Sequence, residues 1–286
     1  MTPWPAWTAS LLATALLAGG VLIQRHVVAW LPLDVPGPGR KQHGRPIPLA
    51  GALLTPPLLL WMLWDPFWPG DRLAAAAVAL ATLIGWFDDR GKAHGGGLDW
   101  RSKAIGLAIV AGLAAASTCD PTHAPLRWLL FAGFTFVFVN ALNFLDNQNG
   151  VAAAVAAVTL LTAGNGLAGM LRNDWTAAAA AAALAFLPWN WPRARLFLGD
   201  AGAYALGTAA AVAVCDGLRH GPSTLWLAAV PLADFTQVVT VRLWLGQRPW
   251  VGDRRHLTHR ALQLGAPTWA LAPLFGAVAW TLTRLA

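Results

Sequence analysis

The chain contains no glutamate, so all 13 of its acidic residues are aspartate. Cysteine is scarce as well, and Cys119 and Cys215 fit no Cys-x-x-Cys or zinc-ligand spacing, so the sequence assigns them no role. Charged residues make up only 12% of the chain, against about 25% in an ordinary soluble domain. The low charge argues against a soluble globular protein. The choice of aspartate matters because this short carboxylate is a good ligand for hard divalent cations.

Apolar residues are abundant: 57% of the 286 residues are hydrophobic, and the apolar stretches recur along the whole length. A helix that spans a membrane needs about 20 mostly apolar residues and satisfies its own backbone hydrogen bonds in lipid. We therefore predict an all-α, polytopic integral membrane bundle of about ten transmembrane helices, with residues 1–286 forming a single membrane-embedded domain. The alternative, a soluble alanine-rich bundle, would have to bury most of 17 tryptophans in one core. The expected spans are residues 7–24, 49–64, 72–87, 104–119, 128–145, 150–171, 175–191, 201–218, 223–243 and 261–284.

The net charge of +7 is unevenly distributed between the connecting segments. Fifteen of the 20 Lys and Arg residues fall in segments 25–48, 88–103, 146–149, 192–200 and 242–260. The positive-inside rule places these segments in the cytoplasm, where basic loops meet anionic lipid, and nucleic acid is not expected as a partner. The same segments carry a group of acids and histidines, so the candidate chemistry gathers on one face: Asp88, Asp89, Asp146, Asp200, Asp253, His43, His256 and His259.

Two acidic motifs follow the third and fifth expected spans. Asp88 and Asp89 are adjacent carboxylates, which repel unless a cation relieves them. A divalent metal with phosphate ligands would do so, and so would solvent with Arg90 as counter-ion. Asn143 and Asp146 are three residues apart and share a face if helical, which suits a sugar, a phosphate or a metal. Polar capping around a tight Asn-Gly turn at residues 149–150 would explain them equally well.

Basic motifs precede the eighth span and follow the ninth. Arg195 can hold a phosphate through charge-assisted hydrogen bonds, while Asp200 is either an N-cap or a metal ligand. His256 and His259, with Arg260 beside them, favour an anion site for a diphosphate over zinc, although a basic patch against lipid headgroups is an alternative.

Two further segments contain notable charged residues, namely the first basic loop and the ninth expected span. The Gly- and Pro-rich loop at residues 34–51 is basic around Arg40 and Lys41, and such loops bind phosphate or touch headgroups. Asp234 lies inside the ninth span, two helical turns from Arg242. A carboxylate in a membrane helix is costly, so these two residues are candidates for a buried pair.

In this order, the motifs resemble those of the polyprenyl-phosphate N-acetylhexosamine-1-phosphate transferase family, and the likeness runs from about residue 34 to residue 260. Residues 34–51 look like the family's first loop, in the form closer to the branch that uses UDP-GlcNAc than to the pentapeptide branch. Residues 85–90 look like its G-x-x-D-D-R, and residues 140–150 like its N-A-x-N-x-x-D-G-x-D-G. Residues 197–202 are similar to F-x-G-D-x-G, and residues 253–260 to D-x-x-H-L-H-H-R. Each motif alone is weak, but their shared order and side are specific.

The resemblance implies a reaction, its substrates and a location. A polyprenyl phosphate, undecaprenyl phosphate in the branch favoured here, attacks the sugar-proximal phosphorus of a UDP-N-acetylhexosamine such as UDP-GlcNAc, and UMP leaves. This is the first membrane step of a cell-surface polysaccharide or cell-wall polymer. The resemblance also implies Mg²⁺ or Mn²⁺ and an active site on the cytoplasmic side of the bacterial plasma membrane. Whether the chain forms a homodimer is left open. Phosphoryl transfer depends mainly on positioning and charge neutralisation, which suits these residues.

The resemblance also implies roles for individual residues. Catalytic roles fall to three carboxylates, and two carboxylates are the expected metal ligands. Substrate contacts fall to residues from four segments. The implied catalytic residues are Asp88, Asp89 and Asp146; the metal ligands are Asp200 and Asp89; the substrate-binding residues are Lys41, Asn143, Asn149, Arg195, His256, His259 and Arg260.

Five positions depart from the family pattern. Two of them are Ala203, where the pattern often has Ser, and Ala50, where it has the first Gly of a Gly-Gly pair. The other three lie in the polar motifs. The pattern has Gly and Asp where this chain has Asn147 and Asn149, and it has His where this chain has Thr258. An Asp-to-Asn change keeps an oxygen ligand but removes a charge and a base. The departures therefore leave a rival hypothesis, in which the chain is a weakened or inactive relative, or a lipid-linked sugar transporter, that binds polyprenyl phosphate.

Overall fold

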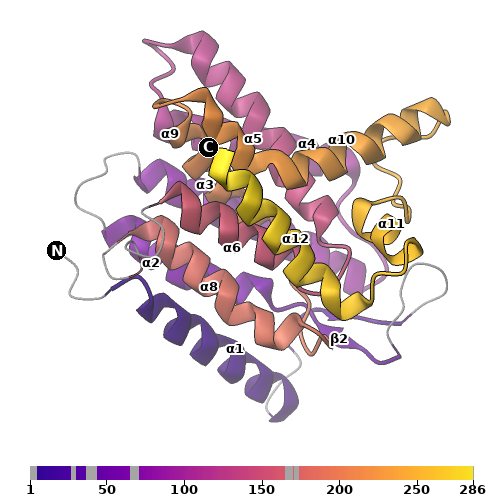
Figure 1. Cartoon of the computed structure of the whole chain (residues 1–286). Helices are drawn as coiled ribbons and strands as arrows, with labels where there is room; N and C mark the ends of the chain where they lie inside the picture. The colour runs from indigo at the N-terminus through magenta and orange to yellow at the C-terminus, as the bar shows by residue number, and fades with distance from the viewer. Residues whose placement is uncertain are drawn as a thin grey trace.

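The computed structural model describes residues 5–26, 30–36, 44–64, 71–164, 170 and 174–285. Within these residues the chain is almost entirely helical (Figure 1). The elements in chain order are α1 (Thr8–His26), β1 (Leu33–Asp34), β2 (Ile47–Pro48), η1 (Gly51–Leu54), α2 (Thr55–Trp64), α3 (Asp71–Ala93), α4 (Trp100–Thr118), α5 (Pro125–Leu145), α6 (Val151–Ala163), α8 (Trp175–Asn190), α9 (Gly199–Gly217), η2 (Pro222–Ala228), α10 (Ala229–Trp244), α11 (Leu257–Gln263), α12 (Thr268–Leu282) and η3 (Thr283–Leu285).

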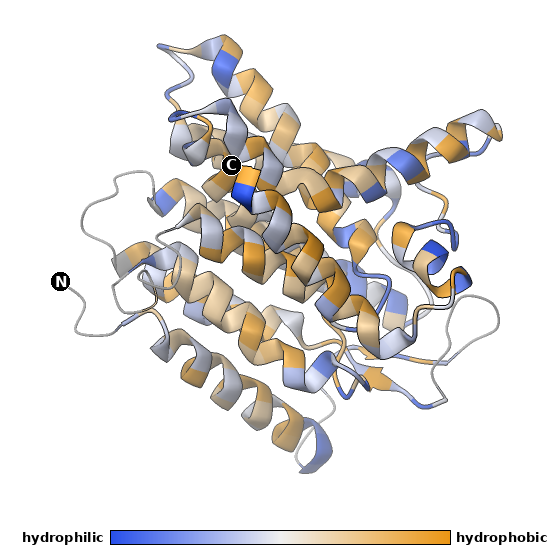
Figure 2. Cartoon of the chain, in the orientation of Figure 1, coloured by the Kyte–Doolittle hydropathy of each residue, from blue (hydrophilic) through white to orange (hydrophobic). Residues whose placement is uncertain are grey.

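The predicted all-α class is confirmed, and each predicted span coincides with helix over much of its length. Three stretches of the described chain are long and apolar enough to cross a membrane: Thr8–His26, Pro125–Leu145 and Pro222–Trp244. These helices are consistent with a helical membrane protein. The number of about ten spans stays a prediction. Figure 2 shows apolar residues along the helices and hydrophilic residues gathered at helix ends and in connections.

The tenth predicted segment, residues 261–284, is not one continuous helix. α11 ends at Gln263, and α12 begins only at Thr268. Between them the backbone turns at Gly265, whose φ of +93° is accessible to glycine and strained for other residues. The polar segment that carries His256 and His259 therefore continues into a short helix of its own, packed beside α12.

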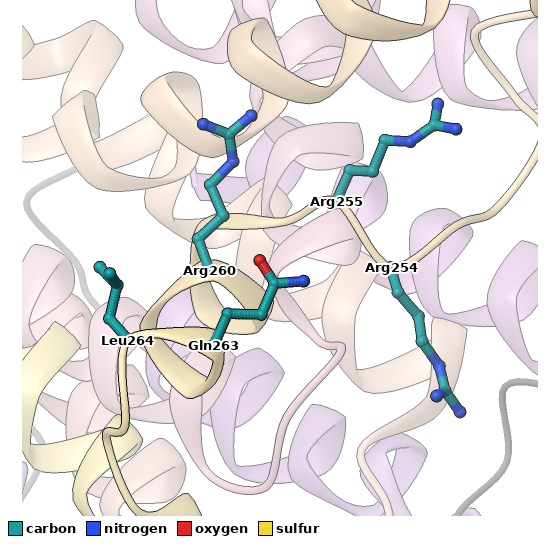
Figure 3. Close-up of a pocket in the computed structure, with 5 residues that line it drawn as sticks. All are labelled: Arg254, Arg255, Arg260, Gln263 and Leu264. Carbon is teal, nitrogen blue, oxygen red and sulfur yellow. The ribbon is translucent and has the colours of Figure 1, made fainter.

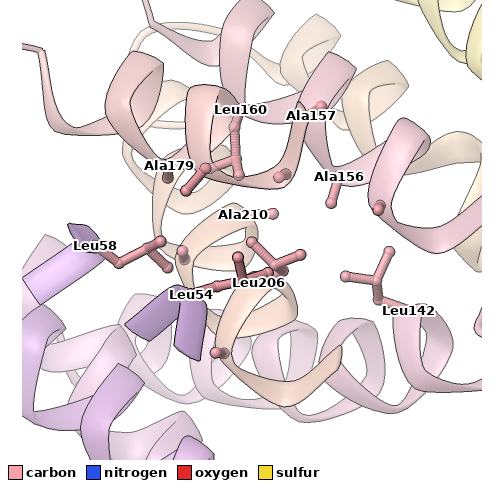
Figure 4. Close-up of a cluster of buried hydrophobic side chains, with 14 of the residues drawn as sticks. Leu54, Leu58, Leu142, Ala156, Ala157, Leu160, Ala179, Leu206 and Ala210 are labelled. Carbon is pink, nitrogen blue, oxygen red and sulfur yellow. The ribbon is translucent and has the colours of Figure 1, made fainter. Parts of the chain in front are cut away.

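Helix α9 forms the centre of the bundle. Its side chains are buried without interruption from Ala201 to Cys215, and it packs against α3, α4, α5 and α6. Nearly all of these side chains are small, which allows neighbouring helix backbones to approach closely. Figure 4 shows the apolar cluster around α9, in which Leu206 and Ala210 meet side chains of η1, α2, α5, α6 and α8.

The described part of the chain has one small sheet, formed by β1 and β2. The strands pair antiparallel, with Leu33 opposite Pro48. Phe197, just before α9, extends this arrangement by donating its N–H to the carbonyl of Pro48 at 2.9 Å, and its own carbonyl accepts from Ala50 at the same distance. The sheet therefore ties the loop after α1 to the start of the central helix.

Candidate active site

The candidate site begins where the C-terminal end of α3 meets the N-terminus of α9. A Cβ atom on Gly85 would lie 2.4 Å from the backbone nitrogen of Ala201, so only glycine permits this approach. The approach brings Asp89 onto the first turn of α9. Its Oδ1 accepts the Asp200 N–H at 3.0 Å, and its Oδ2 accepts the Ala201 N–H at 3.1 Å. Asp89 therefore caps a helix that is more than 100 residues away in sequence, in a position where the helix dipole favours a negative charge.

Two lysines hold the neighbouring carboxylates together. The Oδ2 atom of Asp88 lies 2.7 Å from both Lys92 Nζ and Lys103 Nζ. Lys92 also reaches Asp200 Oδ2 at 3.0 Å, and Lys103 lies 3.7 Å from the same oxygen. Asp88 is fully buried, and both lysines act as its counter-ions, Lys103 largely covered and Lys92 with its side chain half exposed.

Each aspartate has further polar partners that fix its orientation. The Oδ1 atom of Asp88 accepts the Leu98 N–H at 2.7 Å. Asn143 of α5 donates its side-chain amide to Asp200 Oδ1 at 3.1 Å, and Tyr204 donates to Asp200 Oδ2 at 3.4 Å. Asn143 and Asp200, both predicted as site residues, are thus in direct contact.

Lys92 and Lys103 were missed as site residues in the sequence. Lys92 offered a local signal, since it lies four residues after Asp88 and shares its helix face. No local sequence pattern marks Lys103 as a site residue. It lies in the first turn of α4 and meets Asp88 only because α4 folds back against α3.

Charges in the cluster act on one another. Burial raises the pKa of Asp89 to about 7, and the charge of Asp200 adds to this rise. Burial also raises the pKa of Asp146, at the C-terminal cap of α5, to about 7, with contributions from Asp200 and Asp89. For Asp200, burial opposes ionisation, but Lys92 and Lys103 outweigh it and hold the pKa below its usual range.

The cluster therefore holds four aspartates, Asp88, Asp89, Asp146 and Asp200, against two lysines. With every group ionised it would carry two uncompensated negative charges, and this excess adds to burial in raising the pKa values of Asp89 and Asp146. The described side chains contain no group of three or more His, Cys, Asp or Glu placed to hold a metal ion as they stand. A cation would have to take over oxygens that now face the lysines.

The histidine segment is attached beside this cluster. Asp234, fully buried in α10, accepts from His256 Nδ1 at 2.7 Å and from the Leu257 N–H at 2.6 Å. The His256 ring packs edge-on against Phe144 of α5 at 5.9 Å between centroids and lies 5.8 Å from the ring of His259. The Nδ1 atom of His259 is buried and has no hydrogen-bond partner among the described residues. Burial, together with the charges of His256 and Arg254, lowers the pKa of His259.

The expected pairing of Asp234 with Arg242 is wrong. Arg242, also buried, directs its Nε to Asp253 at 3.0 Å and its guanidinium over the Phe144 ring at 5.0 Å. Asp234 instead receives the backbone and the ring of the histidine segment. Asp234 and Arg242 thus share one face of α10 but bind two different parts of the loop that follows it. Their spacing in the sequence does not indicate this difference.

Three other predicted substrate residues, Asn149, Arg195 and Arg260, show no polar contact with the four aspartates in the described part of the chain. Asn149 donates its amide to the Pro192 carbonyl at 3.2 Å. Arg195 is exposed, and no contact of its side chain with the aspartates is found in the described part of the chain. Arg260 lines a hollow of about 440 Å³ together with Arg254 and Arg255 (Figure 3). Lys41 lies outside the described residues, as do Arg40 and His43.

The comparisons with known proteins agree with this arrangement. Residues 72–218, which include all four aspartates, match the model of glycosyl transferase family 4. The chain is 33% identical to a phospho-N-acetylmuramoyl-pentapeptide-transferase of a Synechococcus strain, over 62% of this chain and 56% of that protein. It is 31% identical to a decaprenyl-phosphate N-acetylglucosaminephosphotransferase of Mycobacterium tuberculosis, over 48% of this chain and 41% of that protein. It is 30% identical to a Streptomyces coelicolor protein named only as a glycosyltransferase, over 95% of this chain and 66% of that protein.

These alignments cover about half the length of the first two relatives, whose names fall in different branches of the family. The family model, in contrast, matches more than half of the chain, and its match begins and ends within the bundle that builds the site. Together with the motifs and the helices that bring them into contact, this match shows that the chain belongs to glycosyl transferase family 4.

Proposed function

We propose that the protein transfers an N-acetylhexosamine-1-phosphate, GlcNAc-1-phosphate in the first instance, from a UDP-sugar to a polyprenyl phosphate and releases UMP. The observation that carries this proposal is the cluster of four aspartates and two lysines at the meeting point of α3, α4, α5 and α9. Relatives of the same family are named for phosphate transfer of N-acetyl sugars, and one group of them for a decaprenyl phosphate acceptor.

The residues divide into two groups by charge. The aspartates supply negative charge and proton acceptors, and Asp146 or Asp89, each with a pKa of about 7, can exchange a proton with an acceptor phosphate at neutral pH. Arg260 supplies positive charge, and His256 and His259, on the same segment, supply hydrogen-bonding ring nitrogens. Two phosphorylated substrates would meet strong repulsion at the aspartates alone, so the positive charge must lie on the side from which the diphosphate enters.

The donor set suits a divalent cation such as Mg²⁺ or Mn²⁺. Its oxygens are hard ligands, and its excess of two negative charges matches one such ion. Asp200 and Asp89 are the residues we assign to hold it, with Asn143 beside Asp200. When bound, the ion would neutralise charge on the diphosphate. Lys92 and Lys103 would then be released from Asp200, and both would remain with Asp88.

Asn149 bears on the rival hypothesis of an inactive relative. Its amide bonds the Pro192 carbonyl, and no contact with the four carboxylates is found in the described part of the chain. The replacement of the pattern's Asp at this position therefore does not by itself remove a carboxylate from the cluster. This favours an active enzyme over a binding protein or transporter.

We place the enzyme in the bacterial plasma membrane with the cluster facing the cytoplasm, as a bundle of about ten spans. The support is the distribution of Lys and Arg and the gathering of the site motifs at one set of helix ends. A homodimer would be compatible with this placement, and the oligomeric state is a separate measurement.

The test uses purified protein in detergent with undecaprenyl phosphate, and either UDP-GlcNAc or UDP-GalNAc, with and without Mg²⁺. UMP release and sugar in the lipid phase are followed together. Metal-dependent transfer from one donor is the expected result. Binding of donor without UMP release, in folded protein, would replace the enzyme with the binding hypothesis.

A further inference from the structure

Two of the positions at which this chain departs from the family pattern touch each other. The hydroxyl of Thr258 donates to the side-chain Oδ1 of Asn147. Thr258 is fully buried, and its partner comes from the loop that directly follows Asp146. The bond crosses 111 residues of sequence, so it joins two separate motifs of the site.

The amide of Asn147 is held in one orientation. Its Nδ2 donates to the carbonyl of Phe144 at 2.7 Å, which leaves Oδ1 to face Thr258. The ring of the same Phe144 packs against His256. Asn147 therefore connects the backbone beneath the His256 ring to the segment that carries that histidine.

The bond completes the attachment of three successive residues. His256 and Leu257 are held by Asp234 of α10, and Thr258 is held by Asn147 of the loop after α5. Asp234 fixes the segment to α10, and so does Arg242 through Asp253. The bond to Asn147 is the hydrogen bond that sets the distance of the segment from Asp146, the neighbour of Asn147.

We propose that Asn147 and Thr258 are a matched positioning pair that holds His256 and His259 in register with Asp146, and that each replacement depends on the other. A glycine at position 147 has no acceptor for the hydroxyl, and a histidine at position 258 would need more room than the buried threonine occupies. The inference rests on the proposed transfer reaction, since it names residues that act through the site and do not touch the substrate.

The test is a double-mutant cycle with Asn147→Ala and Thr258→Val, read as kcat and KM for the UDP-sugar and as hydrogen–deuterium exchange of residues 253–263. Each single variant should lose about tenfold in kcat/KM and exchange faster in this segment, because one buried hydrogen bond has lost a partner. The double variant should lose little more than either single one, since both remove the same bond. Thr258→Ser keeps the hydroxyl and should restore transfer.

A matched control is Thr159→Val, which removes another buried threonine hydroxyl, bonded to the Leu227 carbonyl at 2.9 Å in a different part of the bundle. It should leave exchange of residues 253–263 unchanged. As a second arm, Asn147→Gly with Thr258→His should transfer better than Thr258→His alone.

Each outcome of these experiments bears on a different part of the proposal. Additive losses, or failure of Thr258→Ser to restore transfer, would overturn the pairing. Faster exchange with unchanged kcat and KM would reduce the pair to a structural contact and overturn the positioning role. If the unaltered protein transfers sugar from neither donor, the proposed function fails, and the positioning role falls with it. The exchange data would still show whether the bond exists.

Discussion

The change Asp89→Asn should make the protein more stable at high pH while abolishing its activity. Asp89 is 3% exposed, and burial together with Asp200 raises its pKa from 3.8 to about 7. An acid whose pKa is higher in the folded state favours folding fully at low pH, and this contribution is lost as pH rises through the folded pKa. Between about pH 4 and pH 7, the unaltered protein should therefore lose stability at this residue.

The size of the effect follows from the shift. A rise from 3.8 to about 7 corresponds to about 4 kcal/mol, because each pKa unit is about 1.4 kcal/mol. Asparagine avoids the buried charge but keeps only one of the two acceptors that cap α9, at a cost of about 1–2 kcal/mol. The net gain at pH 8 is thus about 2 kcal/mol. At pH 5, where Asp89 is already neutral, the two proteins should differ little.

The assay is a thermal unfolding series in detergent without divalent metal, at pH 5 and pH 8, beside a transfer assay. The Asp89→Asn variant should show a smaller drop in melting temperature between the two pH values, and transfer at least about 100-fold slower. Asp174→Asn is the control, since Asp174 also caps a helix, α8, by accepting two backbone N–H groups, and lies outside the cluster of four aspartates. Asparagine is as good a cap as aspartate, so little change in stability or transfer is expected. Equal pH dependence in the Asp89 variant and the unaltered protein would refute this reasoning, as would full transfer activity.

Three further predictions concern the same cluster. Mg²⁺ should raise the melting temperature of the unaltered protein more at pH 8 than at pH 5, because carboxyls with a pKa of about 7 must lose protons to bind it; an equal rise at both pH values would argue against a metal at these residues. Lys103→Met should slow transfer about 10- to 100-fold by leaving buried Asp88 one ammonium short, measured as UMP release, and an unchanged rate would remove Lys103 from the site. Asn149→Asp would set a carboxylate against the Pro192 carbonyl and should cost about 1 kcal/mol in thermal unfolding without faster transfer, whereas faster transfer would show that an acid at this position still works.

The positions of the helices could be predicted from the sequence. In a chain with so little charge, long apolar runs have few alternatives to forming buried or membrane-spanning helices. The joint placement of Asn143 and Asp200 could also be predicted, since their motifs end or begin helices on the same side of the bundle. The partners of Asp234 could not. Helical spacing offered Arg242 on the same face, but the loop after α10 folds back and supplies His256 and Asp253 to the two residues separately.

The role of Asp89 could be predicted only in part, because the residue is conspicuous in sequence while its partner helix is not. The pair of adjacent aspartates marks a place where charge must be relieved. The charge of Asp88 is balanced by two lysines. The carboxylate of Asp89 instead accepts hydrogen bonds from the N-terminus of α9, more than 100 residues away. No local pattern indicates that contact, since it depends on Gly85 allowing two helix backbones to meet.

The same helix contact predicts that the site keeps its shape if a cation changes its charge. Asp89 is bonded to backbone N–H groups, which cannot move away without unwinding the first turn of α9. Asp200 is bonded to side chains, Lys92 and Asn143, which can move by changing rotamer. A cation that enters the cluster can therefore take the place of Lys92 at Asp200, while Asp89 keeps α9 and its first-turn aspartate in position. The rigid and the exchangeable halves of the site are thus set by whether each carboxylate faces backbone or side chains.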